Sequence, residues 1–396
     1  MSRLENAAWR LRDFLRRDAV LAIACVLAVT SCIAVPPDAQ YATYIDWRTL
    51  GLLFSLMVAT SGLARANVLS LICRVLVRTC GNGSALIASL TALAFFTSMV
   101  VTNDVALVAF VPLALAAMRE AGLTRRIAFT ITCMTVAANM GSMLTPIGNP
   151  QNIYLQSVSG MAPGDLVAIM APYSALAFVL LAALIAGAEL CSGERGERSK
   201  RIERGGWHSP RAGKSGAPKL GHAIALRDVL PWAALIIACL LCVARIAPVE
   251  AAVSTAIIIA LLFDKQALRH VDYALLLTFA AFFVFIGNVT RVMALQQAIT
   301  TIIQGHELLV GVVASQLASN IPAAIMLSGF TSNWHALLVG TNIGGLGTLI
   351  ASMASLISYK QLAVAYPEMK AKYLRLFLSV NFAILAAELG LAFLIS

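Results

Sequence analysis

The sequence has 396 residues, of which 60% are hydrophobic and only 12% are charged, whereas a soluble domain carries about 25% charged residues. Apolar runs of about 17–25 residues recur along the chain, and each is long enough to cross a bilayer. This composition excludes an ordinary soluble domain and predicts an all-α polytopic membrane protein, because a β-barrel would show short alternating segments instead. The net charge of +10 does not indicate a nucleic-acid partner, since the basic residues cluster in short loops between the apolar runs.

The apolar runs predict about nine full spans and two segments that enter the membrane and return. The expected full spans cover about 18–36, 47–65, 126–158, 165–190, 229–246, 248–263, 273–288, 335–358 and 375–394. Pro, Gly and Asn residues interrupt the spans at 126–158 and 335–358, so we expect both to be broken transmembrane helices. The stretches 84–118 and 308–330 have polar centres, VTNDV and LASNIP. These centres favour a re-entrant hairpin in each stretch, with two half-helices that meet at a tip.

The basic residues predict that the N-terminus lies in the cytoplasm of a bacterial-type inner membrane. Five arginines precede the apolar run that begins at Ala19, and we interpret this run as an uncleaved first span rather than a signal peptide, because it is long and more spans follow. Every basic cluster then falls on the cytoplasmic side, including 191–228, which we interpret as a flexible basic linker. The opposite loops, 156–164 and 331–334, contain no Lys or Arg.

The two halves of the chain, 1–190 and 229–396, resemble each other. TSMVVTNDVA (97–106) aligns without a gap with ASQLASNIPA (314–323), and ANMGSMLT (138–145) aligns with TNIGGLGT (341–348). Asp46 precedes Arg65 by the same interval as Asp272 precedes Arg291. In the predicted topology the halves run in opposite directions, which makes them an inverted repeat of the kind that builds secondary transporters.

We expect the two tips and the two broken spans to converge on one binding site. Broken backbone at membrane depth is tolerated where protein or a polar cavity satisfies it, and its free carbonyls and N–H groups can bind ions. The candidate site residues are Thr102, Asn103, Asp104, Thr145, Pro146, Gly148, Asn149, Ser319, Asn320, Thr341, Asn342, Gly344, Gly347 and Thr348. A coupling Na⁺ has candidate ligands in Asn103, Asp104, Asn320 and the carbonyls of the broken helices. We expect Asn152 only to cap the second half of the first broken span.

Three charged residues near these segments have two interpretations each. Asp104 is costly at membrane depth; it either binds the coupling H⁺ or Na⁺, or caps the second half-helix of its hairpin. Arg65 and Arg291 lie at the ends of their spans and either extend to the interface, which we favour, or contact the substrate.

Four strings carry a resemblance to a known group of permeases: TNDVALVAFVPLAL, NMGSMLTPIGNPQNIYL, SQLASNIPAAIMLS and GTNIGGLGTLIASMASLIS. Over about residues 40–394 the chain resembles the ion transporter superfamily, which includes arsenite efflux permeases, citrate and dicarboxylate carriers and NhaD-type antiporters. The resemblance implies a homodimer in which a transport domain moves against a scaffold, elevator fashion. Dicarboxylate carriers of that group bind ligands with Ser-Asn-Thr at each tip. The tips here, Thr102-Asn103-Asp104 and Ser319-Asn320-Ile321, look more like the arsenite and antiporter branches.

These features predict a secondary active permease for a small anion or oxyanion, similar to arsenite, citrate or a dicarboxylate and coupled to H⁺ or Na⁺. The alternative is a Na⁺/H⁺ antiporter on the same scaffold. An intramembrane enzyme is disfavoured because the sequence contains no recognisable catalytic set, and no cofactor other than the coupling ion is expected. The expected partners are the substrate, the bilayer and a second copy of the chain.

Overall fold

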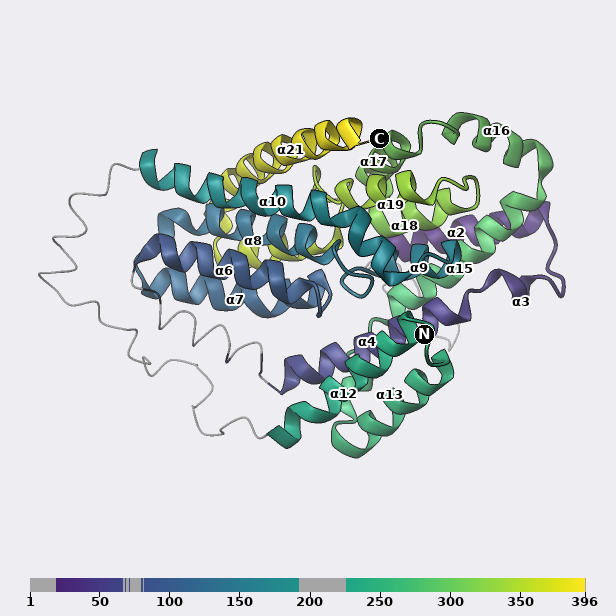
Figure 1. Ribbon diagram of the computed structural model, residues 1–396, viewed down its shortest axis with the longest axis horizontal. Coiled ribbons are helices and arrows are strands. Elements are labelled where there is room, and N and C mark those ends of the chain that lie inside the picture. The colour runs from purple at the N-terminus through teal and green to yellow at the C-terminus, as the bar shows by residue number, and fades with distance from the viewer. Residues whose placement is uncertain are drawn as a thin grey trace, which may run out of the picture.

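The computed structural model describes residues 19–66, 82–191 and 226–395, together with residues 68, 71 and 80, and these residues form helices and no strands (Figure 1). The arginines of the first 17 residues and most of the predicted linker, from 192 to 225, lie outside the described residues. The expected all-α fold is therefore confirmed for the part of the chain that is described.

The first half of the chain contains the first hairpin and the first broken span. Its elements are α2 (Ala19–Ala34), α3 (Tyr41–Tyr44), α4 (Trp47–Arg65), α6 (Gly83–Ser98), α7 (Asn103–Glu120), η1 (Thr124–Arg126), α8 (Ile127–Ser142), α9 (Pro150–Ser159) and α10 (Pro163–Cys191). The hairpin consists of α6 and α7, and the broken span of α8 and α9. Pro150 is the first residue of α9, where a proline fixes the backbone angle and its missing N–H has no helical partner to lose.

The second half repeats this order. Its elements are α12 (Leu226–Val243), α13 (Val249–Phe263), α14 (Gln266–Arg269), α15 (Tyr273–Arg291), α16 (Met293–Ile303), α17 (Glu307–Ala318), α18 (Asn320–Ser328), α19 (Trp334–Ile343), α20 (Met353–Ala365), η2 (Pro367–Met369) and α21 (Lys370–Ile395). Here α17 and α18 form the hairpin, and α19 and α20 the broken span. The short helices α3 and α16 were not expected from the sequence.

Helices occupy all the ranges predicted to span the membrane, but fewer of them qualify as single spans. Four described helices are long and apolar enough to cross a membrane alone, namely α4, α10, α15 and the C-terminal helix that contains α21. The bent pair α16–α17, with an angle of 106° between its helices, would be a fifth. The other predicted spans contain shorter helices. The breaks divide α8–α9 and α19–α20 into short halves, and α2 and α13 have only 16 and 15 residues.

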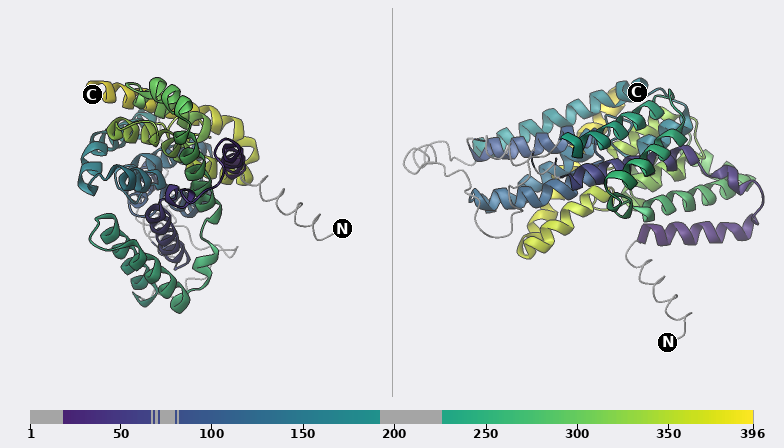
Figure 2. Two further views of the ribbon diagram at one scale, coloured as in Figure 1. Left: turned by 90° about the vertical axis from the view of Figure 1, so that its right-hand side faces the viewer. Right: turned by 90° about the horizontal axis from the view of Figure 1, so that it is seen from below.

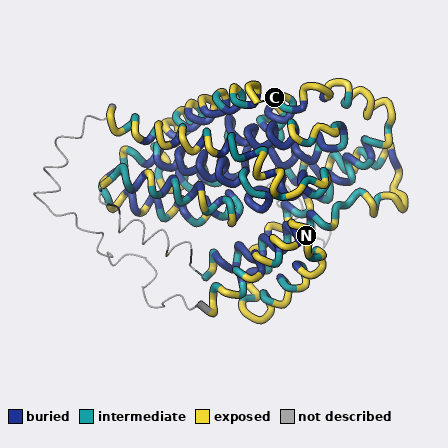
Figure 3. Tube along the Cα trace, in the orientation of Figure 1, coloured by how far each residue is buried: buried dark blue, intermediate teal, exposed yellow. Residues whose placement is uncertain are grey.

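The two hairpins lie in different halves of the molecule. Figure 1 shows α6, α7 and α8 in one half of the long axis and α17, α18 and α19 in the other, and Figure 2 shows the same bundle from two further sides. The centre of the bundle is the most buried part of the described chain (Figure 3). Helix α7 packs against α20, and α9 packs against α18. Each hairpin therefore contacts the broken span of the other half.

Two helices with matching ends, α4 and α15, flank this bundle. The side chain of Asp46 accepts a hydrogen bond from the Thr49 N–H at the start of α4, and Asp272 does the same for Leu275 in α15. At the other end of α4, Arg65 forms an ion pair with Asp264. At the other end of α15, the Arg291 Nη2 lies 2.8 Å from the Asp38 Oδ2, and the Arg291 Nη1 donates to the Tyr44 hydroxyl. The hydrogen bond from Arg291 lowers the pKa of Asp38.

Both arginines therefore make local pairs at the ends of their helices. Neither the ion pair of Arg65 nor the contacts of Arg291 involve a residue of the tips or the breaks. These pairs support the favoured interpretation of the two arginines, in which they reach the interface.

Several basic residues of the described chain lie near one another at helix ends. Arg65 at the end of α4 forms an ion pair with Asp264, next to Lys265. The ammonium of Lys372 donates to the carbonyl of Arg125 at 3.3 Å, which brings the start of α21 to the turn between α7 and α8. This grouping is what the positive-inside pattern predicts, while the side of the membrane on which it lies stays a prediction.

Glycines let each hairpin approach its broken span closely. A Cβ atom on Gly141 of α8 would overlap the backbone carbonyl of Phe95 in α6 and lie 2.8 Å from the Ser98 hydroxyl. On Gly344 it would lie 2.9 Å from the Ser315 hydroxyl of α17. Small residues at such crossings are how membrane helices pack tightly.

We expect Gly141→Ala to reduce the free energy of unfolding by about 1–3 kcal/mol, because a backbone carbonyl cannot move aside as a flexible side chain can. Thermal unfolding in detergent measures the effect. Gly187→Ala is the control, because nothing lies within 4 Å of its Cβ position and alanine favours the helix. Equal unfolding midpoints for Gly141→Ala and the wild type would contradict the close crossing.

Candidate functional site

The first tip is held against the first break by two hydrogen bonds. The Thr145 hydroxyl, in the loop between α8 and α9, donates to the carbonyl of Met99 at the end of α6. The N–H of Asn103, the first residue of α7, donates to the carbonyl of Gly148 at 3.4 Å. Backbone groups that the break frees are therefore satisfied by the tip, as buried backbone requires.

The second tip makes the equivalent bonds to the second break. The Thr348 hydroxyl donates to the carbonyl of Gln316 at 3.3 Å, and the Asn320 N–H donates to the carbonyl of Ala351 at 3.0 Å. The repeat alignment places Thr145 on Thr348. Gln316 adds bonds of its own, because its amide donates to two carbonyls of the break and accepts from the Thr348 N–H. Each tip is therefore fastened to its own broken span in the same way.

Asn139, near the end of α8, links the first tip to the second break. Its Oδ1 accepts from the Asn103 amide at 3.0 Å and from the Ser352 hydroxyl at 3.0 Å. Its own amide donates to the Ser355 hydroxyl at 3.2 Å. Asn139 is 4% exposed, so one buried amide connects segments from both halves of the chain.

Asn342, near the end of α19, makes the corresponding link to the first break. Its Oδ1 accepts from the Asn149 amide at 3.2 Å, and its amide donates to the Asn152 Oδ1 at 2.7 Å. When the repeat alignment is continued without a gap, it places Asn149 on Ser352 and Asn152 on Ser355. The partners of Asn342 are therefore the repeat equivalents of the partners of Asn139.

Half of the candidate residues lie in this hydrogen-bonded network at the two tips and the two breaks, which we call the central cluster. Its members among the candidates are Asn103, Thr145, Gly148, Asn149, Asn320, Asn342 and Thr348. Ser319 belongs to the second tip, has φ +75° and donates to its neighbour Asn320. Gly344 and Gly347 provide space beside Ser315 and Gln316, and Gly347 has φ +104°.

Three candidates have weaker links to the central cluster. The Thr341 hydroxyl donates to the Leu337 carbonyl of its own helix. Thr102 is the N-cap residue of α7, without a hydrogen bond from its side chain to the helix. Pro146 is buried in the first break, where it lacks an N–H to donate.

The position of Asp104 excludes its interpretation as a helix cap. Helix α7 begins at Asn103 and its N-cap is Thr102, so Asp104 is the second helical residue. Its Oδ1 is buried and has no hydrogen-bond partner among the described residues. A carboxylate in the first turn is favoured by the helix dipole, but this one satisfies no N–H of the helix end.

Sequence reasoning missed five residues of the central cluster and gave a sixth the wrong role. The missed residues are Asn139, Gln151, Gln316, Ser352 and Ser355. Asn139 already stood in the repeat alignment, and continuing that alignment would have found both serines. Asn152 lies inside α9, donates to the carbonyls of Met143 and Thr145 and accepts from Asn342. It therefore crosslinks the break instead of capping a helix.

The central cluster can bind a ligand through neutral groups and helix ends. Helices α7, α9, α18 and α20 all begin at a tip or a break, so their N–H groups and positive dipole ends face this region. The tips and breaks contain no Lys or Arg. Among the described residues, no group of three or more His, Cys, Asp or Glu side chains is placed to hold a metal ion.

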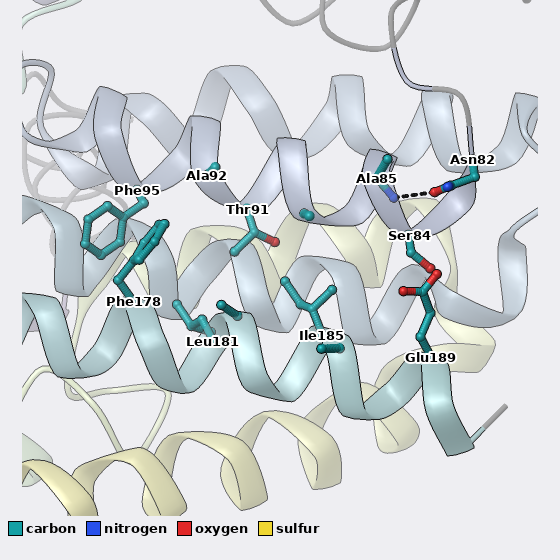
Figure 4. A pocket seen from close by; sticks show the side chains of 13 residues that line it. Asn82, Ser84, Ala85, Thr91, Ala92, Phe95, Phe178, Leu181, Ile185 and Glu189 are labelled. Atoms are coloured by element: carbon teal, nitrogen blue, oxygen red, sulfur yellow. Dashed lines mark hydrogen bonds between the residues drawn. The ribbon is translucent and has the colours of Figure 1, made fainter.

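A hollow lies elsewhere, between α6 and α10. It has a volume of about 440 Å³ and is lined mostly by apolar side chains such as Phe95, Phe178 and Leu181. Figure 4 shows Asn82, Ser84 and Glu189 at one end of this groove. None of its lining residues belongs to the central cluster. A smaller recess beside Ser319, Pro322 and Asp272 reaches the second tip.

Known proteins resemble the chain over most of its length. A family model described as citrate transporter matches residues 7–333. Inner membrane protein YbiR of Escherichia coli is 31% identical over 80% of each chain. The uncharacterized transporter MJ0456 of Methanocaldococcus jannaschii is 29% identical over 80% of this chain and 81% of its own. The silicon efflux transporter LSI3 of rice is 33% identical over 31% of this chain and 24% of its own. The match to the family model covers most of the chain, which therefore belongs to the citrate transporter family and is a membrane transporter of the ion transporter superfamily.

Proposed function

We propose that the protein is a secondary active permease for a small anion or oxyanion, which binds at the central cluster. The observation that carries this proposal is the matched set of bonds at the breaks: Asn139 with Ser352 and Ser355, and Asn342 with Asn149 and Asn152. Polar groups buried in the middle of an apolar bundle are costly. A binding site built from the two tips and the two breaks gives a reason for the chain to retain these polar groups.

The proposal includes an inverted repeat and elevator-type movement. Equivalent residues of the two halves make equivalent hydrogen bonds, and the hairpins lie in different halves of the molecule, which supports the inverted repeat. In the elevator, α6–α10 and α17–α21 move together, because the central cluster joins them. The helices α4, α12 and α13 pack on one another and supply part of the scaffold. The homodimer and the cytoplasmic N-terminus remain predictions from the resemblance and the basic clusters.

The chemistry of the cluster favours a compact oxyanion, or its neutral acid, over a polyanion. Amide and hydroxyl groups and helix ends donate hydrogen bonds there, but no Lys or Arg offers a full positive charge. Asp104 adds a carboxylate at the first tip, which would repel a ligand with several charges unless H⁺ or Na⁺ neutralised it. An arsenite-like ligand meets these conditions better than citrate does.

A second function, Na⁺/H⁺ antiport, is favoured by one observation, the Oδ1 of Asp104, which has no hydrogen-bond partner in the part of the chain that the structure describes. Oxygen ligands from Asp104, the tip amides and the freed carbonyls suit a hard cation such as Na⁺. In this case Na⁺ itself is the substrate and no anion is bound.

A ligand screen separates the two functions. Purified protein is heated with arsenite, silicate, sulfate, citrate or a dicarboxylate, each with and without Na⁺ and at two pH values. An anion permease is stabilised by one of these anions, because a ligand that binds the folded state raises the unfolding temperature. Stabilisation by Na⁺ alone, with no response to any anion, would support the antiporter instead.

We expect Asp104→Asn to abolish the dependence of transport on the coupling ion, because the amide keeps the shape and removes the charge. Initial rates in proteoliposomes, with imposed pH and Na⁺ gradients, measure this. Asp165→Asn is the control, since Asp165 is exposed in the first turn of α10. If Asp104→Asn kept the gradient dependence of the wild type, the coupling role of this carboxylate would be wrong.

We expect Asn342→Ala to weaken substrate binding by roughly tenfold or more, because orphaned partners such as Asn149 and Asn152 each cost about 1–3 kcal/mol. The concentration dependence of transport, for the ligand found in the screen, measures the loss. Asn288→Ala is the matched control, because Asn288 is equally buried but bonds to Ser31 and Tyr41 away from the tips. Equal affinities in both variants would place the binding site elsewhere.

A further inference from the structure

A second carboxylate lies inside the bundle, away from the central cluster. Glu388 belongs to the buried stripe of α21, which also includes Asn381, Leu385 and Ala392. Its side chain is fully buried, at 0% exposure. In the part of the chain that the structure describes, neither of its carboxylate oxygens has a hydrogen-bond partner.

No described cation faces Glu388 from the helices packed against α21, which are α8, α10, α19 and α20. Helix α8 contains no charged residue. The charged or basic residues of the other three are exposed; they are Asp165, Glu189, His335 and Lys360. The further titratable groups on these helices are Cys133, Tyr173 and Tyr359. Of these, Tyr173 of α10, which is 2% exposed, lies within electrostatic range of Glu388. The short η2 also packs against α21 and carries the exposed Glu368, and α21 itself carries the exposed Lys370, Lys372 and Arg375 and the buried Tyr373.

These surroundings favour the neutral form of Glu388. An ionised carboxylate without a cation or a donor is among the costliest groups to bury, and it avoids this cost by taking up a proton. A small movement of α21 cannot bring Glu388 to water, because a rotation that exposed Glu388 would also turn the apolar residues of the buried stripe out of the bundle. We therefore expect the Glu388 carboxyl group to carry a proton while α21 is packed in the bundle.

Helix α21, which carries Glu388, packs against α8 and α10, and these two helices are bonded to each other next to the central cluster. Ser174 follows Tyr173 in α10 and donates to the Met140 carbonyl of α8 at 2.8 Å. Met140 is the residue after Asn139, which joins the first tip to the second break. A change of charge at Glu388 would therefore act on the end of α8 where the ligand is proposed to bind.

We propose that Glu388 is a proton-binding site within the bundle, separate from Asp104 and the tips, through which proton concentration acts on transport. The effect on transport rests on the proposed function, whereas proton binding does not. Loss of the proton leaves an anion in an apolar site, loosens the packing of α21 on α8 and α10, and disturbs Asn139. Binding of the proton restores the packed state.

Infrared difference spectroscopy of the purified protein tests proton binding without any substrate. Spectra are recorded between about pH 5 and about pH 9, a range in which an ordinary glutamate is already ionised. The wild type should show the C=O stretch of a protonated carboxyl group that disappears as the pH rises. Glu388→Gln should lose this band, and Asp104→Asn, which removes a carboxylate whose Oδ1 is also buried without a partner among the described residues, should keep it. A wild type without the band, or a Glu388→Gln variant that retains it in full, would overturn the proposal.

The stability of the same samples gives a second readout. The folded state holds the proton of Glu388 more tightly than the unfolded chain does, so stability is greatest at low pH and is lost as the pH rises. The unfolding midpoint should therefore fall between about pH 5 and about pH 9 in the wild type, and fall less in Glu388→Gln. Equal declines in both would contradict the proposal. If Glu388→Gln does not fold, Glu388→Asp replaces it, and its carboxyl band should shift in frequency without being lost.

Discussion

The fold depends on satisfying backbone that is broken in the middle of an apolar bundle. Each break frees carbonyl and N–H groups where no water can serve them, and each tip does the same. The chain solves both problems together, because the tip donates to the break, as Asn103 does to Gly148 and Asn320 to Ala351. The amides of Asn139 and Asn342 then tie the two halves to each other. Neither half can satisfy its own polar groups alone, so the two halves must assemble.

This arrangement also explains why the central cluster can serve as a binding site. Its bonds are between neutral groups at 2.5–3.5 Å, and each is individually worth about 0.5–1.5 kcal/mol. A ligand can exchange with such bonds without breaking a strong ion pair. The two carboxylates add the charge that a proton or Na⁺ can control. Asp104 stands at the first tip, while Glu388 lies in α21, which packs against the helix of Asn139, so the proposed roles of the two carboxylates are separate.

The local sequence predicted the breaks and the tips well, because backbone chemistry dictates where a helix can be interrupted. Proline and glycine mark the breaks at 126–158 and 335–358, and Asn-rich centres mark both tips, because those residues favour or permit non-helical backbone. Side-chain roles were predicted less well. The cap, which was one of two interpretations of Asp104, and the cap expected of Asn152 were both wrong, because neither residue caps a helix. Gln316 drew no attention, because a glutamine on an apolar helix shows its role only through the carbonyls of Gly344 and Leu346 that it bonds.

The sequence alone determined the class of the protein and the positions of its breaks, because hydropathy, proline and glycine act locally and along the chain. It could not determine which amides meet. Asn139 reaches Ser352 and Ser355, and Asn342 reaches Asn149 and Asn152, across intervals that no local pattern spans. Only the packing of α8 and α19 against the opposite breaks decides these contacts. The burial of Glu388 was likewise decided by the tertiary structure, since one glutamate in an apolar helix can face water, lipid or protein, and only the neighbouring helices settle which.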